Sequence, residues 1–343
     1  MARFAPILAC LAAALLFGAA TPLSKSLLDQ MGPVTLAGLL YLGAALGVAP
    51  LALRRGSLPA VPSRANRLRL AVALLCGGIL APVIFLYGLQ RTPAGSAALW
   101  LNLEVVATTL LAGVLFREHL GARVLFACGV VAAGGALLVL PLEGGALGGA
   151  PWVALACLCW GLDNNATAVI DGFTPSQVTF TKGLLAGAVN LAAGLSLEGR
   201  ISDWRSMLVP FALGAVSYGL SLVLYIGAAQ RLGAARSQML FATSPFWALL
   251  LSWWALGEAV SAAQLAAGGV MAAGIALMLT ARHAHAHRHG SAMHTHAHRH
   301  DDAHHLHVHE SLPTSARHTH AHTHEPLAHE HPHEPDLHHR HEH

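Results

Sequence analysis

The feature that most constrains this chain is a series of ten apolar runs between residues 4 and 281. An α-helix of about 20 residues spans the ~30 Å hydrocarbon core of a bilayer. The runs are 4–24, 34–53, 69–89, 94–116, 121–141, 150–170, 176–197, 207–229, 235–256 and 261–281. They are too long for barrel strands, and lipid cannot hydrogen-bond loose backbone groups. The sequence therefore predicts an all-α polytopic membrane protein with ten transmembrane helices.

Composition also favours a membrane protein. Charged residues make up 11% of the chain and the mean hydropathy is +0.54, whereas soluble domains carry roughly 25% charged residues. The five cysteines all fall inside predicted helices, where buried thiols act as apolar fillers. The first run resembles a secretory signal, but the apolar stretch continues and no soluble domain follows, so we expect it to remain as the first span.

Arginine is distributed unequally between the loops. With the N-terminus inside, eleven arginines fall at inner ends of the predicted helices and three at outer ends, namely Arg91, Arg200 and Arg205. Inner loops of membrane proteins are enriched in Lys and Arg. We therefore expect an inner or plasma membrane protein, and the even number of spans places both termini in the cytoplasm.

An internal repeat divides the ten spans into two sets of five. When Glu118 is aligned with Glu258, "EHLGARVLFACGVVAAGGAL" matches "EAVSAAQLAAGGVMAAGIAL" at 11 of 20 positions, and we call this offset the repeat shift. A weaker match, at a slightly larger offset, relates "FGAATPLSK" to "WGLDNNATA". Five is odd, so the two repeats have opposite orientations in the membrane. Inverted repeats are typical of transporters, whose solute site lies near the midplane between the halves.

These motifs resemble the EamA-type branch of the drug/metabolite transporter superfamily. The resemblance rests on the two five-helix repeats, on Gly18, Pro22 and Lys25 of the first span, and on "FREHLG" and "LGEAVS" before the fifth and tenth spans. It implies EamA-type repeats at 1–141 and 142–282, a proton-coupled or exchanging carrier, and export of a small metabolite, amino acid or toxic compound. The segment 283–343 lies outside the resemblance.

The chain departs from this family at one position. Such proteins often carry a basic residue within the second helix of each repeat. Lys182 matches that pattern, whereas Leu40 occupies the corresponding place in the first repeat. A charge mechanism that obeys the two-fold symmetry is therefore not expected.

Glu104 is the most deeply placed ionisable residue, about ten residues from either end of the fourth span. Helical spacing predicts that Trp100, Glu104 and Thr108 share a face, and the repeat places Ser244 at the matching depth. An intramembrane carboxylate can carry a proton or meet a cation, or can lock helices together as a paired group. We favour transport as its role.

The sixth span carries a second polar group, Asp163-Asn164-Asn165. Three successive polar side chains cannot all face lipid, because successive helical residues point in different directions. They either line a hydrated path or hydrogen-bond between helices. Lys182, near the start of the seventh span, is a candidate for the same path.

Charged residues near the span ends have a weaker case for function. Lys25 either serves transport or extends to the outer surface to pair with Asp29. Glu118 and Glu258 precede helices, where capping and contact between helices are expected. His119 is expected at the surface.

The chain ends in a histidine-rich tail, because every histidine except His119 lies between His283 and His343. Apolar residues are too few to form a core, so we expect disorder and a cytoplasmic position. Neutral imidazole binds Ni, Co, Zn and Cu ions, and metal binding requires deprotonated rings. The candidate ligands are His283, His285, His287, His289, His294, His296, His298, His300, His304, His305, His307, His309, His318, His320, His322, His324, His329, His331 and His333.

The sequence leaves three functions open. The first choice is efflux of a divalent transition metal such as nickel or cobalt, through Glu104 and the Asp163 region, with the tail as collector. The alternative is an EamA-type exporter of amino acids or other metabolites whose tail only buffers or senses metal. The third is a membrane metal sensor that transports nothing. No enzyme or nucleic-acid motif competes, no cofactor is required, and the expected partners are lipid, a small solute or metal ion, and a second copy in a homodimer.

Overall fold

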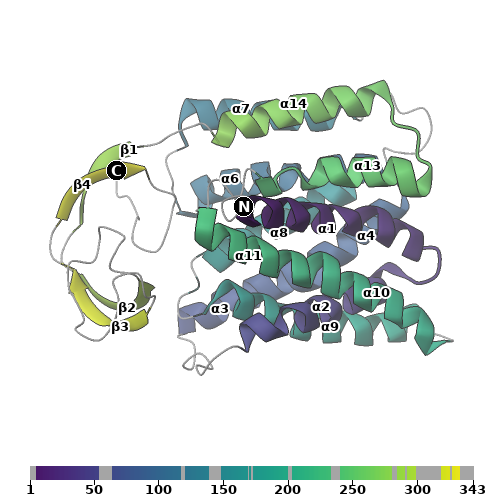
Figure 1. Ribbon diagram of the computed structural model, residues 1–343, viewed down its shortest axis with the longest axis horizontal. Coiled ribbons are helices and arrows are strands. Elements are labelled where there is room, and N and C mark those ends of the chain that lie inside the picture. Colours follow the sequence, from purple (N-terminus) through teal and green to yellow (C-terminus); the bar gives the residue numbers. More distant parts are fainter. Residues whose placement is uncertain are drawn as a thin grey trace.

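The computed structural model describes a helical bundle with strands beyond its last helix (Figure 1). The described residues are 5–53, 64–116, 120–138, 148–168, 170, 173–199, 203–232, 240–279, 284–289, 292–298, 318–324 and 327–332. Glu118 and His119, for which the sequence predicts a cap and a surface position, lie outside them.

Within these residues, ten helical crossings appear where the sequence predicts them. They are α1 (Ala5–Leu27), α2 (Pro33–Ala52), α3–η1–α4 (Arg64–Val72, Ala73–Leu80, Ala81–Gln90), α5–α6 (Ala94–Trp100, Leu103–Phe116), α7 (Ala122–Leu137), α8 (Ala150–Ala168), α9 (Pro175–Leu197), η3–α10–η4–α11 (Trp204–Met207, Leu208–Leu213, Gly214–Leu220, Ser221–Leu232), α13 (Ser244–Leu256) and α14 (Ala262–Leu279). The all-α polytopic prediction is confirmed for the bundle.

Apolar length varies among these helices. Six described helical segments have at least 18 residues and enough hydropathy to cross a bilayer, and α7, α13 and α14 provide shorter apolar stretches. Helix α8 is in neither group, because Asp163, Asn164 and Asn165 lower its hydropathy. The most polar crossing of the bundle is therefore the one that carries the candidate site.

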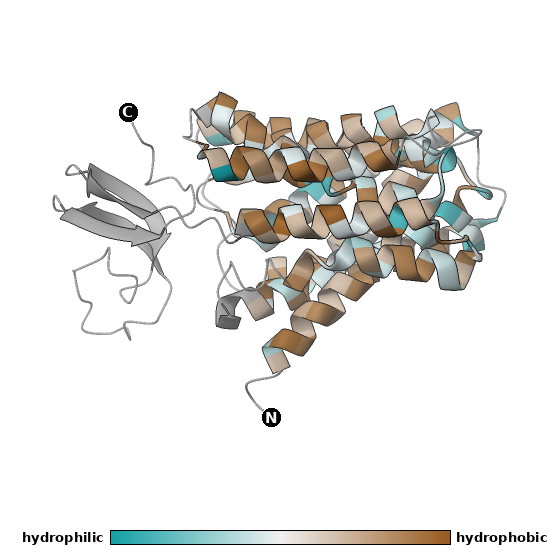
Figure 2. Ribbon diagram, turned by 90° about the horizontal axis from the view of Figure 1, so that it is seen from above, coloured by the Kyte–Doolittle hydropathy of each residue, from teal (hydrophilic) through white to brown (hydrophobic). Residues whose placement is uncertain are grey.

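Helix α1 begins and α14 ends at the same end of the bundle, which we call the proximal end (Figure 1). The opposite, distal end carries the connections α1–α2, α4–α5, α9–η3 and α13–α14. Figure 2 shows apolar ribbon along most of the helix lengths and polar residues gathered at the distal connections. This distribution matches helices that cross the hydrocarbon core of a membrane.

Helices α7 and α14, the fifth and tenth crossings, pack against each other through glycines. A Cβ atom added to Gly134 would lie 2.6 Å from Met271 Cγ, and one added to Gly274 would lie 2.7 Å from Val131 Cγ2. The repeat shift that relates the two halves takes Gly134 to Gly274 and Val131 to Met271. Small residues let membrane helices approach closely, and here the same contact is made twice, as the sequence repeat predicts.

A second pair of contacts obeys the same relation. A Cβ atom at Gly18 of α1 would lie 3.1 Å from the backbone nitrogen of Ala248 in α13, and one at Gly161 of α8 would lie 3.0 Å from that of Thr108 in α6. The repeat shift takes Thr108 to Ala248, and the weaker sequence match aligns Gly18 with Gly161. The first crossing thus meets the ninth as the sixth meets the fourth.

The third and eighth crossings each contain a π-helical segment, η1 and η4. A π-helix carries i→i+5 hydrogen bonds and occurs mostly as a short insertion at functional sites. Helix α2 packs along α9 and also contacts η4, while η1 contacts α8 and α9. The irregular segments therefore lie beside the second helix of the opposite half.

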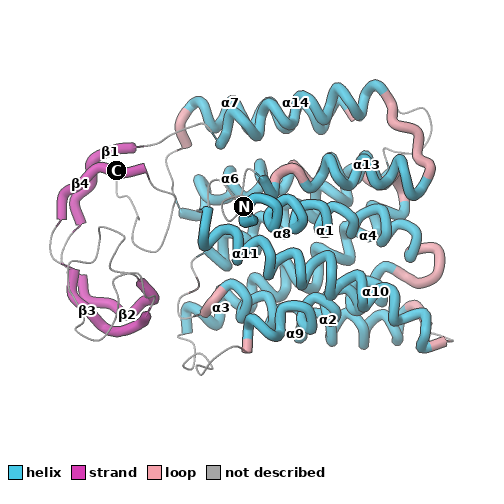
Figure 3. The backbone as a smooth tube through the Cα atoms, in the orientation of Figure 1, coloured by secondary structure: helices cyan, strands magenta, loops and turns pink. Residues whose placement is uncertain are grey.

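Four short segments of the tail are strands, where the sequence predicts disorder. Strand β1 (Ala284–His289) pairs with β4 (Leu327–Pro332), and β2 (Ala292–His298) pairs with β3 (His318–His324), both antiparallel (Figure 3). The alternation of histidine with other residues has the two-residue period of a strand. The strands are held by backbone hydrogen bonds, which need no apolar core and which composition therefore does not predict.

We predict that Gly274→Ala lowers the thermal stability of the detergent-solubilised protein by about 1–3 kcal/mol, because the added methyl overlaps Val131. Gly269→Ala, in the same helix, meets nothing within 4 Å. It should leave stability unchanged or raise it by up to about 1 kcal/mol, because Ala favours helices more than Gly. Equal melting temperatures for the two variants would contradict the close packing of α7 on α14.

Candidate functional site

The polar residues predicted inside the membrane form a cluster on three helices. Glu104 comes from α6, Asp163, Asn164 and Asn165 from α8, and Lys182 from α9. Helix α6 packs on α8, and η1 fills the space between α8 and α9. Five of the seven candidates predicted for solute or coupling-ion contact are therefore brought together.

Asp163 and Lys182 form an ion pair. The Lys182 Nζ atom donates to Asp163 Oδ2 at 2.5 Å, and Thr167 Oγ1 donates to Asp163 Oδ1 at 3.0 Å. The carboxylate side chain is 4% exposed and the lysine side chain 18%. Both carboxylate oxygens are satisfied, so the buried charge has the partners that a low-dielectric environment requires.

Glu104 belongs to a second hydrogen-bonded group, which is more accessible. Asn164 Nδ2 donates to Glu104 Oε1 at 2.8 Å and to Thr108 Oγ1 at 3.1 Å. Asn164 is exposed and Glu104 is half-buried. These side chains are the more exposed part of the cluster.

Asn165 holds the helices that carry these groups. Its Nδ2 atom donates to the Thr108 backbone oxygen at 2.9 Å and to the Gly161 oxygen at 2.8 Å. The residue is 5% exposed. Both amide hydrogens are used for contacts within and between α6 and α8, so Asn165 positions the site rather than facing it.

The π-helical segment η1 packs against α8 and α9, the helices that carry the ion pair. Tyr41 Oη donates to the Gly77 oxygen at 2.6 Å, and Trp160 Nε1 donates to the same oxygen at 3.2 Å. Asn190 Nδ2 reaches the next carbonyls, Gly78 O at 3.2 Å and Ile79 O at 3.3 Å. These donors satisfy carbonyls of an irregular helix in lipid.

Gly77 leaves the space that the Asp163 carboxylate occupies, since a Cβ atom there would overlap Asp163. Sequence reasoning missed Gly77, Tyr41 and Trp160. The sequence contains only a weak signal for Tyr41 and Trp160. They are aromatic residues with one polar atom in otherwise apolar spans, and such an atom needs a hydrogen-bond partner when it is buried.

The cluster joins residues of both halves and has no symmetry-related copy among the described residues. The sequence repeat relates Glu104 to Ser244 and places Lys182 near the position of Leu40. Ser244 is 7% exposed, at the start of α13, and its backbone oxygen faces Gly18 of α1. It lies at the α1–α13 contact, the symmetry equivalent of the α8–α6 contact. The packing follows the two-fold relation, whereas the charged residues do not repeat.

Lys25 lies apart from the cluster, near the distal end of α1. Its Nζ atom donates to the backbone oxygens of Leu89 at 2.6 Å, Gln90 at 3.1 Å and Thr92 at 3.1 Å. These three bonds use all three ammonium donors. The predicted pairing with Asp29 does not describe this arrangement, whereas a role of Lys25 in transport stays a prediction.

Two predictions from helical spacing have different outcomes. Asn164 bridges Glu104 and Thr108, which confirms that these two share a face. Trp100 does not share it, because its Nε1 atom donates to the Gly135 oxygen of α7 at 3.0 Å. The helix is interrupted between α5 and α6, so the regular helical period does not continue from Trp100 to Glu104.

The expected contact between helices at Glu258 is confirmed, as a cap on α5 and not on the helix that follows Glu258. Its carboxylate accepts from the backbone nitrogens of Ala94 at 2.7 Å and Gly95 at 3.0 Å, at the start of α5.

The predicted metal ligands divide into two groups. Within the strands lie His285, His287, His289, His294, His296, His298, His318, His320, His322, His324, His329 and His331, whereas His283, His300, His304, His305, His307, His309 and His333 lie outside the described residues. The strand register places five histidine pairs opposite each other: His285–His331, His287–His329, His294–His322, His296–His320 and His298–His318.

Chemically, the membrane cluster offers an acid, an ion pair and amide and hydroxyl groups. Glu104 can accept a proton or an ammonium group, and Lys182 can bind a carboxylate. In the part of the chain that the structure describes, no group of three or more His, Cys, Asp or Glu side chains is placed to hold a metal ion. The cluster is suited to a small solute that carries both charge and hydrogen-bonding groups.

Comparison with known proteins agrees with the fold. A model of the EamA-like transporter family matches the chain twice, over residues 4–140 and 147–280. A solved crystal structure with 20% sequence identity aligns with a TM-score of 0.56, over 79% of this chain and 95% of the other. That likeness concerns the fold alone.

Two curated relatives cover most of the bundle. One, from Methanothermobacter thermautotrophicus, is called an uncharacterized transporter and is 28% identical over 81% of this chain and 87% of its own length. The other, an uncharacterized protein of Pseudomonas aeruginosa, is 32% identical over 74% of this chain and 85% of its own. With the family model covering both five-helix halves, this chain belongs to the EamA-like transporter family, whose members are multi-pass membrane transporters of small solutes.

Proposed function

We propose that this protein is a secondary carrier that exports a small polar solute across an inner or plasma membrane, as a monomer or homodimer with both termini in the cytoplasm. The observation that carries the proposal is the polar cluster of Glu104, Asp163 and Lys182 inside a bundle of apolar helices. An ionisable group near the bilayer centre costs about 2.5–3.5 kcal/mol on insertion scales, and such groups mark solute and ion pathways.

The chemistry of the cluster favours an amino-acid-like or other zwitterionic metabolite. A solute ammonium group can bind Glu104 at its accessible side, while a solute carboxylate can compete with Asp163 for Lys182. A divalent cation is less suited, because the Lys182 ammonium group already occupies the Asp163 oxygen. Because of the ion pair, we place the metabolite before the transition metal, whereas the histidine-rich tail favours the metal from sequence.

An exchange mechanism is part of the same proposal, and the same contacts support it. A solute carboxylate that binds Lys182 would displace it from Asp163. Return of the Lys182–Asp163 pair would then expel the solute carboxylate. This exchange needs only side chains that already touch, and it accounts for a carboxylate–lysine pair inside lipid.

Export of nickel or cobalt is a second candidate, favoured by the tail. Imidazole nitrogen is a preferred ligand of these ions, and the strand register sets five histidine pairs opposite each other. On this alternative the tail collects metal for the carrier, whereas on the first proposal the tail buffers or senses metal.

We predict that Glu104→Gln reduces solute flux in proteoliposomes at least about tenfold, the effect of about 1.4 kcal/mol. Glutamine keeps an oxygen for the Asn164 hydrogen bond but cannot carry the charge. The melting temperature should stay near that of the parent, which separates loss of transport from loss of folding.

Glu198→Gln is the matched control, because Glu198 is an exposed carboxylate at the end of α9, outside the cluster. Its flux should equal that of the parent. Undiminished flux in Glu104→Gln, measured with labelled amino acids and with nickel, would reject the assignment of Glu104. Absence of flux for every solute class in the parent would favour a sensor instead.

Removing residues 283–343 should abolish most nickel and zinc binding by the purified protein. His119→Ala, which changes the one histidine outside the tail, should leave binding unchanged. Binding by the full chain should weaken as pH falls below ~6.5, because protonated imidazole cannot bind metal. Calorimetric titration above and below this pH measures both effects, and undiminished binding after truncation would contradict the assignment.

Cell tolerance separates the two substrate classes. Cells that express the full chain should tolerate toxic amino-acid analogues better than cells with Glu104→Gln, and tail removal should not alter this tolerance. If the tail and Glu104 are instead both needed for tolerance of nickel or cobalt, the second candidate is correct.

A further inference from the structure

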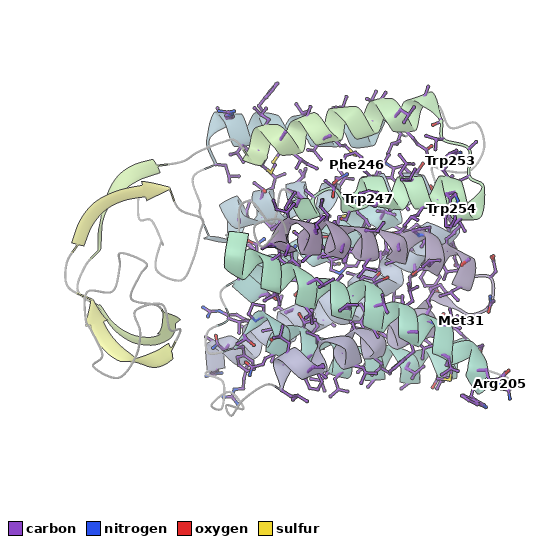
Figure 4. All side chains as sticks on the ribbon, viewed as in Figure 1. Met31, Arg205, Phe246, Trp247, Trp253 and Trp254 are labelled. Atoms are coloured by element: carbon purple, nitrogen blue, oxygen red, sulfur yellow. The ribbon has the colours of Figure 1, made fainter. Side chains whose placement is uncertain are left out.

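We propose that the distal end of the bundle is a gate, held shut by Lys25, which binds carbonyl groups at the turn between α4 and α5, and by Glu258, which binds the amide groups that follow the turn. The inference rests on the proposed carrier function, since only a carrier needs an end that opens. The helices bring the two side chains to this end, where Met31, Arg205, Trp253 and Trp254 are also found (Figure 4).

Lys25 holds the first side of the turn. Its ammonium group donates hydrogen bonds to the backbone oxygens of Leu89 and Gln90 at the end of α4 and of Thr92 in the turn. Carbonyls at a helix end have no partner within the helix, and a lysine can satisfy them. The contact ties α1 to the end of the third crossing.

Glu258 holds the second side of the turn, from the other half of the molecule. Its two carboxylate oxygens accept from the backbone nitrogens of Ala94 and Gly95. Next to them, Gln264 Nε2 donates to Ser96 Oγ at 3.0 Å, and both residues are nearly buried. Hydrogen bonds to a charged group are stronger than neutral ones. The connection between α13 and α14 is thereby fastened to the first half.

Two buried hydroxyl groups at this end are unfavourable in the closed arrangement, because they lack hydrogen-bond partners. Ser24 is fully buried and Thr92 is 3% exposed, yet their Oγ atoms have no hydrogen-bond partner among the described residues. A buried polar group without a partner is unfavourable relative to water. If opening of this end exposes the two hydroxyls to water, they gain hydrogen bonds that the closed arrangement lacks.

A contact of the same chemistry provides the control. Glu198, at the end of α9, accepts from the backbone nitrogens of Val34 and Thr35 at 2.9 Å, at the start of α2. Helices α2 and α9 are packed along their length through glycines such as Gly38 and Gly187. We therefore expect Glu198 to stabilise a fixed helix pair and to have no part in opening.

The experiment uses Ser24→Cys as a reporter in the full chain, solubilised in detergent and treated with a polar maleimide. Labelling is quantified by mass spectrometry for each cysteine. Ser24 is fully buried, so the reporter should react slowly. Adding Glu258→Ala or Lys25→Gln should raise its rate about tenfold, the effect of losing charge-assisted hydrogen bonds. Adding Glu198→Ala should leave the rate unchanged.

Native Cys128 in α7, which is 4% exposed, reports general loosening and should keep its low reactivity in every variant. If Glu258→Ala does not fold, the comparison of Lys25→Gln with Glu198→Ala decides. Equal acceleration by Glu198→Ala, or no acceleration by either gate variant, would overturn the proposal. Labelling needs no solute, so its outcome is independent of whether the proposed solute class is correct.

Discussion

The ion pair between Lys182 and Asp163 is the interaction on which the arrangement of the site depends. Charges inside a membrane are stable only with partners, and here an α9 ammonium, an α8 carboxylate and the Thr167 hydroxyl satisfy one another. The pair needs space, which Gly77 leaves in the π-helical part of the third crossing. The freed carbonyl of Gly77 in turn needs donors, and Tyr41 and Trp160 supply them. A single buried charge pair thus explains why four crossings meet as they do.

Symmetric packing and asymmetric charge together suit a carrier. The glycine contacts between α7 and α14, and those of α1 with α13 and α8 with α6, repeat at corresponding positions of both halves. Similar packing in both halves gives alternative arrangements of comparable free energy, which a carrier needs in order to expose a site to either side. The polar cluster does not repeat under this relation, so the proposed solute site has one charged group of residues and not two equivalent ones. The gate proposed at the distal end joins the halves where such a motion would begin.

The ten crossings could be predicted because apolar runs of bilayer length form helices in lipid. The repeat could be predicted because close helix contacts require small residues at the same positions of both halves. The clustering of Glu104, Asn164 and Lys182 was also predictable, since polar groups inside a membrane are stable only with polar partners. The break after Trp100, the π-helical segments and the partners of Lys25 were not. These features depend on backbone carbonyls and on contacts between residues far apart in the sequence, neither of which changes hydrophobic periodicity. The strand pairing of the tail also joins residues far apart in the sequence, which composition does not predict.

A double-mutant cycle on Asp163→Asn and Lys182→Met tests the central claim most directly. Each single change leaves an unpaired charge in the membrane interior, so each should lower thermal stability by about 3–5 kcal/mol. The double variant buries no charge and should regain most of that stability, while solute flux stays abolished because the solute has lost its partners. Stability losses that simply add in the double variant, or flux that survives there, would show that the pair neither holds the site together nor carries the solute.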